Sequence, residues 1–156
     1  NKINRSTFHM PQESERITRK KRIDQLLRAS DWKIIPYTES IDLSNLTHHA
    51  VEELPTKNGF ADYALIVNGK MLGVVEAKKL QVGAMNVLEQ AKRYSKDVDI
   101  TIGEWEKYRI PFLYSSNGEL IYFLDVRESK NINRQVFSFH SPKALENLFN
   151  SKLATA

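Results

Sequence analysis

Residues 59–78 constrain the fold more than any other stretch of the chain. Two apolar runs, over 60–67 and 71–77, flank the pair Asn68-Gly69. This pair between apolar runs is a strong signal for a β-hairpin, because both residues readily adopt the positive φ angles of a two-residue turn. We therefore predict two antiparallel strands that are joined at Asn68-Gly69.

Three charged residues interrupt these apolar runs: Asp62, Glu76 and Lys78. An unpaired charge inside a sheet costs roughly several kcal/mol, so a buried strand does not carry one without a reason. Alternate residues of a strand share a face, and Glu76 and Lys78 therefore point the same way. Two carboxylates and an ammonium group at one end of a hairpin favour a site for a hard divalent cation and the water that it activates.

The register of the hairpin decides whether the two carboxylates can meet. With a plain two-residue loop, Val67 would face Lys70. Counting back, Asp62 would then lie opposite Val75, and Glu76 would point to the other face of the sheet. A three-residue loop or a bulge in one strand instead sets Asp62 opposite Glu76, and bulges are common beside active sites. We predict this slip, with the two carboxylates close enough to share one cation.

These residues match a known pattern. Asp62 followed by Glu76-Ala77-Lys78 resembles the active-site motif of the PD-(D/E)xK nucleases. Further along, Gln90 and Tyr94 resemble the Q-x-x-x-Y motif of RecB-like nucleases in that superfamily. In this order and spacing, the three pieces are similar to the N-terminal nuclease domain of type I restriction enzyme R (motor) subunits. The similarity extends over about residues 15–149.

The resemblance implies an α/β fold, the PD-(D/E)xK restriction-endonuclease-like core, with a mixed central β-sheet flanked by helices. It also implies Mg²⁺-dependent hydrolysis of DNA phosphodiester bonds by Asp62, Glu76 and Lys78. The two carboxylates and the backbone carbonyl of Ala77 would bind the metal ion. Lys78 would hold the attacking water or the scissile phosphate. Without the other motif residues, an ordinary surface ion pair would explain Glu76 and Lys78 equally well.

Four residues have expected supporting roles. Superfamily members often bring a further acid from the first helix to the metal, and Glu15 is the candidate, although the helix dipole explains an acid in a first turn equally well. Gln90 and Tyr94 would stack on one face of a helix over residues 84–95 and support DNA engagement. A polar pair at a helix edge is the alternative for them. Lys79 is expected on the same DNA-binding surface.

The composition is that of a globular domain, since 41% of the 156 residues are hydrophobic and 27% are charged. No stretch approaches the roughly 20 apolar residues that span a bilayer, so no membrane association is expected. The absence of cysteine excludes disulfides and thiolate metal sites, and it fits a cytoplasmic location. The net charge of +4 is compatible with a nucleic-acid partner without deciding the matter. We expect a flexible arm over residues 1–13, the nuclease domain over 14–149 and a linker over 150–156.

The resemblance sets expectations for the rest of the protein as well. The chain begins at Asn1 rather than Met and contains no phosphate-binding loop of the G-x-x-x-x-G-K-[ST] kind, so the ATP-binding motor of this family would lie outside it. Specificity and methylation subunits would be partners, and cleavage of double-stranded DNA would follow ATP-driven translocation. A standalone RecB-like DNA repair nuclease, or an inactive DNA-binding or assembly module on the same fold, are the alternatives.

The first helix is expected to start at a Ser14 cap and to end near residue 29, with an apolar stripe that includes Ile23 and Leu27. Six basic residues crowd its other faces. They form either a solvated face or a phosphate-contacting surface. The six are Arg16, Arg19, Lys20, Lys21, Arg22 and Arg28.

The remaining elements follow from apolar runs and turn residues. Residues 38–57 show no clear period and are expected to form a long connection, with His48-His49 as a surface feature. Glu52 and Glu53, close before the hairpin, are expected to be ordinary loop acids, and an approach to the site is the alternative for them. We expect strands over 32–37, 110–115, 120–126 and 134–140, a second hairpin around Asn117-Gly118, and a final helix opened by Ser141-Pro142.

Overall fold

The structure, a computed structural model, describes residues 2–56, 59–79, 110–128 and 134–151. No helix in these ranges is both long enough and apolar enough to cross a membrane. The described elements are, in chain order, α1 (Lys2–Ala29), β1 (Lys33–Pro36), the 3-10 helix η1 (Leu43–Asn45), β2 (His48–Thr56), β3 (Gly59–Val67), β4 (Lys70–Ala77), β5 (Phe112–Ser116), β6 (Ile121–Asp125), β7 (Arg134–Val136) and α3 (Pro142–Asn150).

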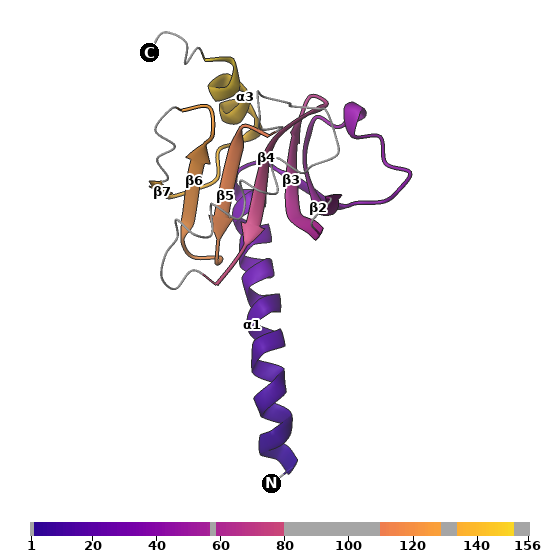
Figure 1. The fold of residues 1–156 in the computed structure, drawn as a ribbon, viewed down its shortest axis with the longest axis vertical. Coiled ribbons are helices and arrows are strands. Elements are labelled where there is room, and N and C mark those ends of the chain that lie inside the picture. The colour runs from indigo at the N-terminus through magenta and orange to yellow at the C-terminus, as the bar shows by residue number, and fades with distance from the viewer. Residues whose placement is uncertain (1, 57–58, 80–109, 129–133, 152–156) are drawn as a thin grey trace.

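The strands form one seven-stranded sheet in which spatial order equals chain order. β2, β3 and β4 are antiparallel neighbours, as are β5, β6 and β7 (Figure 1). β1 runs parallel to β2, and β5 runs parallel to β4. The sheet is therefore mixed, which confirms the expected α/β fold with a mixed sheet. The parallel step from β4 to β5 requires a crossover connection between the two strands.

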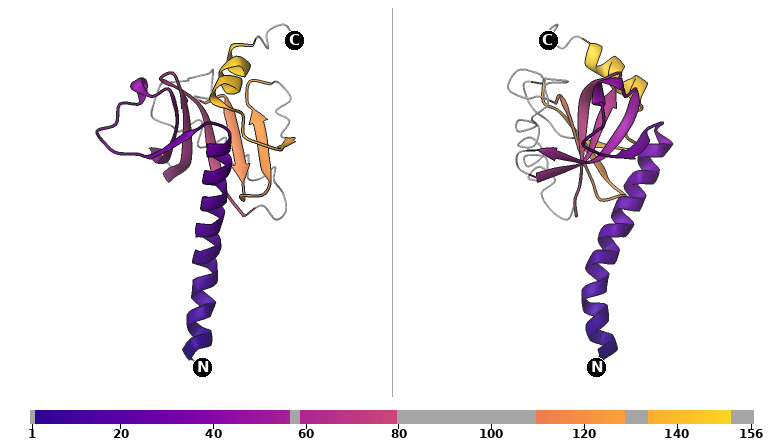
Figure 2. Two further views of the ribbon diagram at one scale, coloured as in Figure 1. Left: turned by 180° about the vertical axis from the view of Figure 1, so that it is seen from behind. Right: turned by 90° about the vertical axis from the view of Figure 1, so that its right-hand side faces the viewer.

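The two faces of the sheet bury separate apolar clusters. One cluster joins strand residues such as Leu65 and Phe112 to Ile23 and Leu27 of α1 and to Leu145 of α3. Figure 2 shows α1 and α3 on this same side of the sheet. The other cluster lies on the opposite face and includes strand residues together with Leu43 of η1. Below, the first is called the helix-covered face and the second the opposite face.

α1 is longer than expected, because it begins at Lys2 rather than at Ser14. The expected flexible arm over residues 1–13 is therefore helical from residue 2 onward, and Ser14 lies inside the helix instead of capping it. Figure 1 shows the N-terminal half of α1 extending beyond the sheet. A helix that is nucleated elsewhere gains one backbone hydrogen bond for each residue it adds, so this half needs no apolar period to continue the helix.

The expectation of a long connection over residues 38–57 was wrong, because this segment contains η1 and β2. Its period is hidden by Glu53, which has a positive φ of 57°, and by Pro55. A proline is tolerated here because β1 pairs only with residues 49–52 of β2 and leaves the end of the strand without a neighbour on that side. His48 is exposed and His49 is half-buried, in line with a surface feature.

The turn signals of the sequence are confirmed. Asn68 and Gly69 have φ angles of 49° and 79° and form the predicted two-residue turn. The second hairpin joins β5 and β6 around Asn117-Gly118. Ser141 caps α3 by accepting a hydrogen bond of 3.1 Å from the Ala144 backbone N–H. β7 is shorter than the strand expected over 134–140, and the expected helix over 84–95 lies outside the described residues.

A buried ion pair fixes the C-terminal end of α3. Asp125 at the end of β6 and Arg127 lie 2.9 Å apart, and each side chain is 2% exposed. Arg127 also donates to the carbonyl oxygens of Leu148 and Phe149, at 3.0 and 2.8 Å. These carbonyls belong to the last turn of the helix, where carbonyl groups depend on donors from outside the regular helical pattern; Leu148 also accepts from the cap residue Ser151. The pair therefore ties α3 to the sheet.

We expect Arg127→Ala to lower the free energy of unfolding by about 3–5 kcal/mol, because it leaves the Asp125 charge buried without its partner. Urea unfolding of the 156-residue chain measures this loss. Arg134→Ala is the matched control, since Arg134 pairs with Glu128 at 3.8 Å on the surface and should cost less than about 1 kcal/mol. Equal losses in the two variants would contradict the role given to the buried pair.

Candidate functional site

A β-bulge sets the register of the β3–β4 hairpin. Next to the turn, Val67 pairs with Lys70, as in a plain two-residue hairpin. The register then shifts, so that Leu65 pairs with Gly73 and Leu72 becomes an extra residue in β4. The predicted slip is confirmed: the hairpin has a two-residue loop followed by a bulge. Every residue of β4 beyond Leu72 therefore points to the face opposite to the one that a plain hairpin would give it.

The bulge brings Asp62 and Glu76 to the same face. Tyr63 pairs with Val75, which sets the next residues along, Asp62 and Glu76, opposite one another. The backbone N–H of Ala77 donates a 2.7 Å hydrogen bond to Asp62 Oδ2, which ties the Asp62 side chain to β4. The two carboxylates lie on the opposite face of the sheet, away from α1 and α3, because Tyr63 and Val75 belong to the helix-covered cluster.

Lys78 follows directly after β4 and is half-buried. Its backbone N–H donates a 2.9 Å hydrogen bond to the carbonyl oxygen of Ser116, so the pairing with β5 continues to this residue. The positive charge of Lys78 acts on Glu76, whose pKa it lowers. Lys78 thus acts electrostatically on Glu76, as the Glu-x-Lys spacing predicts.

Glu76 is a buried acid rather than part of a surface ion pair. Its residue exposure is 2%, and its Oε1 has no hydrogen-bond partner among the described residues. Burial, followed by the charge of Asp62, raises the pKa of the Glu76 carboxyl to about 8 against the opposing effect of Lys78. Without a bound cation, the carboxyl therefore keeps its proton in most molecules at neutral pH.

Ser115 extends this row by one strand. In the parallel pairing of β4 with β5, Glu76 lies beside Ser115, so the two side chains share a face. Ser115 is fully buried, and its Oγ has no hydrogen-bond partner in the part of the chain that the structure describes. Buried polar atoms rarely lack partners. Glu76 and Ser115 therefore place two such atoms in neighbouring positions of the described sheet.

The sequence alone did not identify Ser115. It belongs to no motif, and its place beside Glu76 depends on a strand pairing across the whole β4–β5 connection. The one available signal was that Ser115 is a polar residue at the end of an apolar run. If that run pairs in parallel with the Glu-x-Lys strand, Ser115 can lie beside Glu76. Sequence reasoning cannot fix that register.

The donor set fits a hard divalent cation such as Mg²⁺, because Asp62, Glu76, Ser115 and the Ala77 backbone offer oxygen atoms only. The unpartnered Glu76 Oε1 fits the same group. Within the described ranges, no third Asp, Glu, His or Cys side chain joins Asp62 and Glu76 in a cluster of metal ligands. The protein therefore supplies two carboxylates, which is typical of a Mg²⁺ ion that keeps several waters.

The other expected site residues lie elsewhere. Glu15 is exposed and forms a 3.8 Å ion pair with Lys79, so it does not join the two carboxylates in the described structure. Glu52 and Glu53 lie on β2 and both pair with Lys20, at 3.5 and 3.6 Å. Gln90 and Tyr94 lie outside the described residues.

Comparison with known proteins gives the context for this arrangement. A sequence profile described as "Type I restriction enzyme EcoKI endonuclease subunit second domain" matches residues 30–149. The type I restriction enzyme EcoKI endonuclease subunit of Escherichia coli (strain K12) is 26% identical over 94% of this chain. The chain spans 16% of the length of that relative. No solved structure matches the chain significantly.

The raised pKa of Glu76 predicts a specific pH dependence of stability in the absence of metal. The folded protein holds this proton up to about pH 8, whereas the ordinary value is 4.5. The stabilising contribution of the protonated Glu76 carboxyl to the free energy of unfolding is therefore fully present below pH 4.5. It is lost as the pH rises from there through about 8. Glu76→Gln removes the ionisation and should be more stable than wild type at about pH 9, by at least about 1 kcal/mol.

Urea unfolding of the 156-residue chain in EDTA, over a series of pH values, measures this difference. Glu39→Gln, which changes an exposed carboxylate, is the control and should follow the wild type at every pH. A Glu76→Gln curve parallel to that of the wild type would show that Glu76 is not held in its protonated form.

Proposed function

The chain belongs to the family of the type I restriction enzyme EcoKI endonuclease subunit second domain, and we propose that it is the Mg²⁺-dependent nuclease domain of a restriction subunit of this kind. The family description gives a place within the subunit and no activity for that domain. The assignment of the nuclease activity to it rests on the residues of the bulged hairpin.

One observation carries the proposal: the bulge gathers Asp62 and Glu76 on one face, with Lys78 close behind them. The buried Glu76 oxygen without a partner supports a bound cation at this place. The order of the elements, with α1 before the β2–β4 meander and a parallel step to β5, supports the PD-(D/E)xK core that the resemblance implies. The family match favours a restriction subunit over a standalone repair nuclease. The intact Asp, Glu and Lys set argues against an inactive DNA-binding or assembly module.

In the proposed mechanism, Asp62, Glu76 and the carbonyl of Ala77 would hold a Mg²⁺ ion. A bound Mg²⁺ would supply an activated water and would offset the charge that develops on the phosphorus centre. The Ala77 N–H keeps Asp62 turned toward Glu76, since it donates to Oδ2 at 2.7 Å. Lys78 supplies a point charge for the scissile phosphate or the attacking water. Ser115 offers a hydroxyl beside Glu76 in a place that bulk water does not reach.

The proposal includes the context of the whole subunit. Double-stranded DNA is the substrate, an ATP-binding motor elsewhere in the subunit moves the DNA, and specificity and methylation subunits complete the complex in the cytoplasm. Cleavage would follow translocation, so the domain alone would cut little DNA. Gln90, Tyr94 and Lys79 would contact the DNA, and Glu15 is retained only as a candidate further acid near the metal.

We expect Asp62→Ala, Glu76→Ala and Lys78→Ala each to lower the rate of DNA cleavage by on the order of 10²–10³, because each removes a preorganised group from the reaction centre. Supercoiled plasmid incubated with the full restriction complex, Mg²⁺ and ATP measures cleavage, and ATP hydrolysis should be unchanged. Lys33→Ala, at an exposed position on β1, is the control for loss of a lysine. Robust Mg²⁺-dependent cleavage by the Glu76→Ala complex would refute the assignment.

We expect Ser115→Ala to weaken Mg²⁺ or Mn²⁺ binding by about 10-fold, because groups that support metal ligands typically contribute this much to affinity. Isothermal titration calorimetry with the 156-residue chain measures the affinity. Ser116→Ala is the matched control: Ser116 is equally buried, but its Oγ accepts a 3.0 Å hydrogen bond from the Gly118 N–H. Equal metal affinity in wild type and Ser115→Ala would exclude Ser115 from the site.

A further inference from the structure

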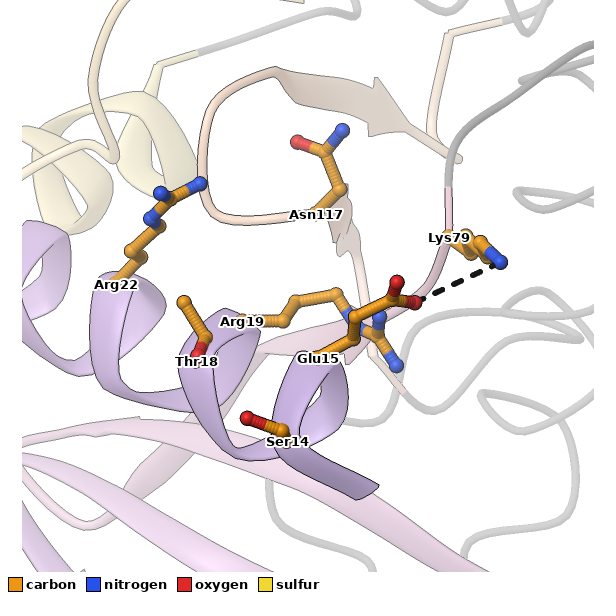
Figure 3. Close-up of a pocket in the computed structure, with 7 residues that line it drawn as sticks. All are labelled: Ser14, Glu15, Thr18, Arg19, Arg22, Lys79 and Asn117. Carbon is orange, nitrogen blue, oxygen red and sulfur yellow. Dashed lines mark ion pairs between the residues drawn. The ribbon is translucent and has the colours of Figure 1, made fainter. Parts of the chain in front are cut away.

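A second polar site lies on the other side of the β4 end. It is a cavity of about 410 Å³ between α1, the residues after β4 and the β5–β6 loop (Figure 3). All of its described lining side chains are polar or charged. Three of them are cations, Arg19, Arg22 and Lys79, and one is an acid, Glu15. The cavity therefore favours an anionic ligand.

Among the described cations of the cavity, Arg19 is the one with a buried nitrogen that lacks a hydrogen-bond partner. Arg22 pairs with Glu119 at 2.7 Å and Lys79 pairs with Glu15 at 3.8 Å, and all four of these side chains are more than half exposed. Exposed pairs of this kind exchange easily with other charges. By contrast, Nε of Arg19 is buried and has no hydrogen-bond partner in the described structure. Figure 3 shows the Arg19 side chain reaching from α1 toward the side of the cavity where Glu15 and Lys79 lie.

The walls of the cavity are held in place by close packing. A Cβ atom at Gly118 would lie 2.8 Å from Arg22 Cβ and 3.2 Å from the Arg19 carbonyl oxygen, so the β5–β6 loop rests directly on the backbone of α1. One turn further along α1, the hydroxyl of Tyr63 donates to the Asp24 carboxylate. The position of Arg19 relative to the sheet is therefore fixed before any ligand binds.

The cavity adjoins the proposed metal site along the chain. Lys79 follows Lys78, and successive side chains of an extended segment point to opposite sides. Asn117, which also lines the cavity, lies two residues after Ser115. A ligand in the cavity would thus lie next to the strand end that carries Glu76 and Lys78.

We propose that this cavity binds a backbone phosphate of the DNA strand, beside the phosphate that is cut. The inference rests on the proposed function, because it takes DNA as the ligand of the neighbouring metal site. Arg19 supplies the fork of N–H donors that matches phosphate oxygens, and Lys79 supplies a point charge. In the free protein, Glu15 forms an ion pair with Lys79. The phosphate replaces Glu15 as the partner of Lys79, so Glu15 opposes DNA binding.

The test measures binding of a labelled DNA duplex to the 156-residue chain by fluorescence anisotropy in EDTA, over a series of salt concentrations. Each phosphate contact contributes about 0.9 to the slope of log affinity against log salt. Arg19→Ala should weaken binding severalfold and reduce this slope by about 0.9. Lys21→Ala removes the same charge from an exposed position of α1 that does not line the cavity, and it should leave the slope unchanged. Equal slopes in the two variants would overturn the proposal.

Glu15→Gln separates this role from that of a metal ligand. Loss of an opposing charge should strengthen duplex binding in EDTA, whereas loss of a metal ligand would weaken Mg²⁺ binding and leave duplex binding in EDTA unchanged. The second result would count against the proposal. Arg19→Lys keeps the charge, and it should recover part of the affinity in a variant whose thermal unfolding matches that of the wild type.

Two further readouts identify the source of the phosphate and separate the two proposals. If inorganic phosphate at constant ionic strength raises the Tm of the wild type, but not of Arg19→Ala, while both bind duplex equally, the cavity takes a free phosphate and the DNA assignment is overturned. Because binding is measured without metal, an Arg19-dependent slope in a protein that never cuts DNA would leave this inference standing and refute the nuclease. If the protein cuts DNA but the slope does not depend on Arg19, the nuclease proposal stands and the phosphate site in the cavity is refuted.

Discussion

The single extra residue in β4, Leu72, is the feature on which both the core and the site depend. Beyond it, Val75 points to the helix-covered face and Glu76 to the opposite face. A hairpin without the bulge would exchange them, placing a carboxylate among Leu27, Tyr63 and Phe112. The residue directly after the extra one is Gly73. A Cβ at this position would lie 3.2 Å from Leu65 Cδ1, so a larger residue would crowd the Leu65 side chain. The bulge therefore decides whether the helix-covered face is apolar while the opposite face carries both carboxylates, Asp62 and Glu76.

Sequence reasoning reached this bulge because two requirements conflicted: the Asn68-Gly69 turn fixes one register, and a shared cation needs the other. It failed where partners are distant in the chain. β2 was missed because Glu53 and Pro55 disrupt its period, and its pairings with β1 and β3 make it a strand. Ser115 was missed because nothing local marks it. The early start of α1 was missed because the part of a helix that extends beyond the sheet needs no apolar stripe, and the sequence therefore shows no helical period there.

Burial of Glu76 has opposite effects on stability and on function. In the metal-free protein, the buried carboxyl is held in its protonated form, so protons and cations compete for the same oxygen atoms. The desolvation that raises its pKa also strengthens its attraction for a bound ion, since few waters compete. The protein thus holds a desolvated acid at the place where we propose that a cation binds.

The strand order has a consequence for how the site is assembled during folding. Each strand pairs with its neighbour in the chain, so most pairings close short loops, which costs little chain entropy. The pairing of β4 with β5 joins the most widely separated residues of the six pairings, and it is also the one that sets Ser115 beside Glu76. A nascent chain that has formed only the β2–β4 meander holds both carboxylates but lacks the third member of the row. The complete row of oxygen donors is thus present only once β5 has joined β4 across the longest connection of the described sheet.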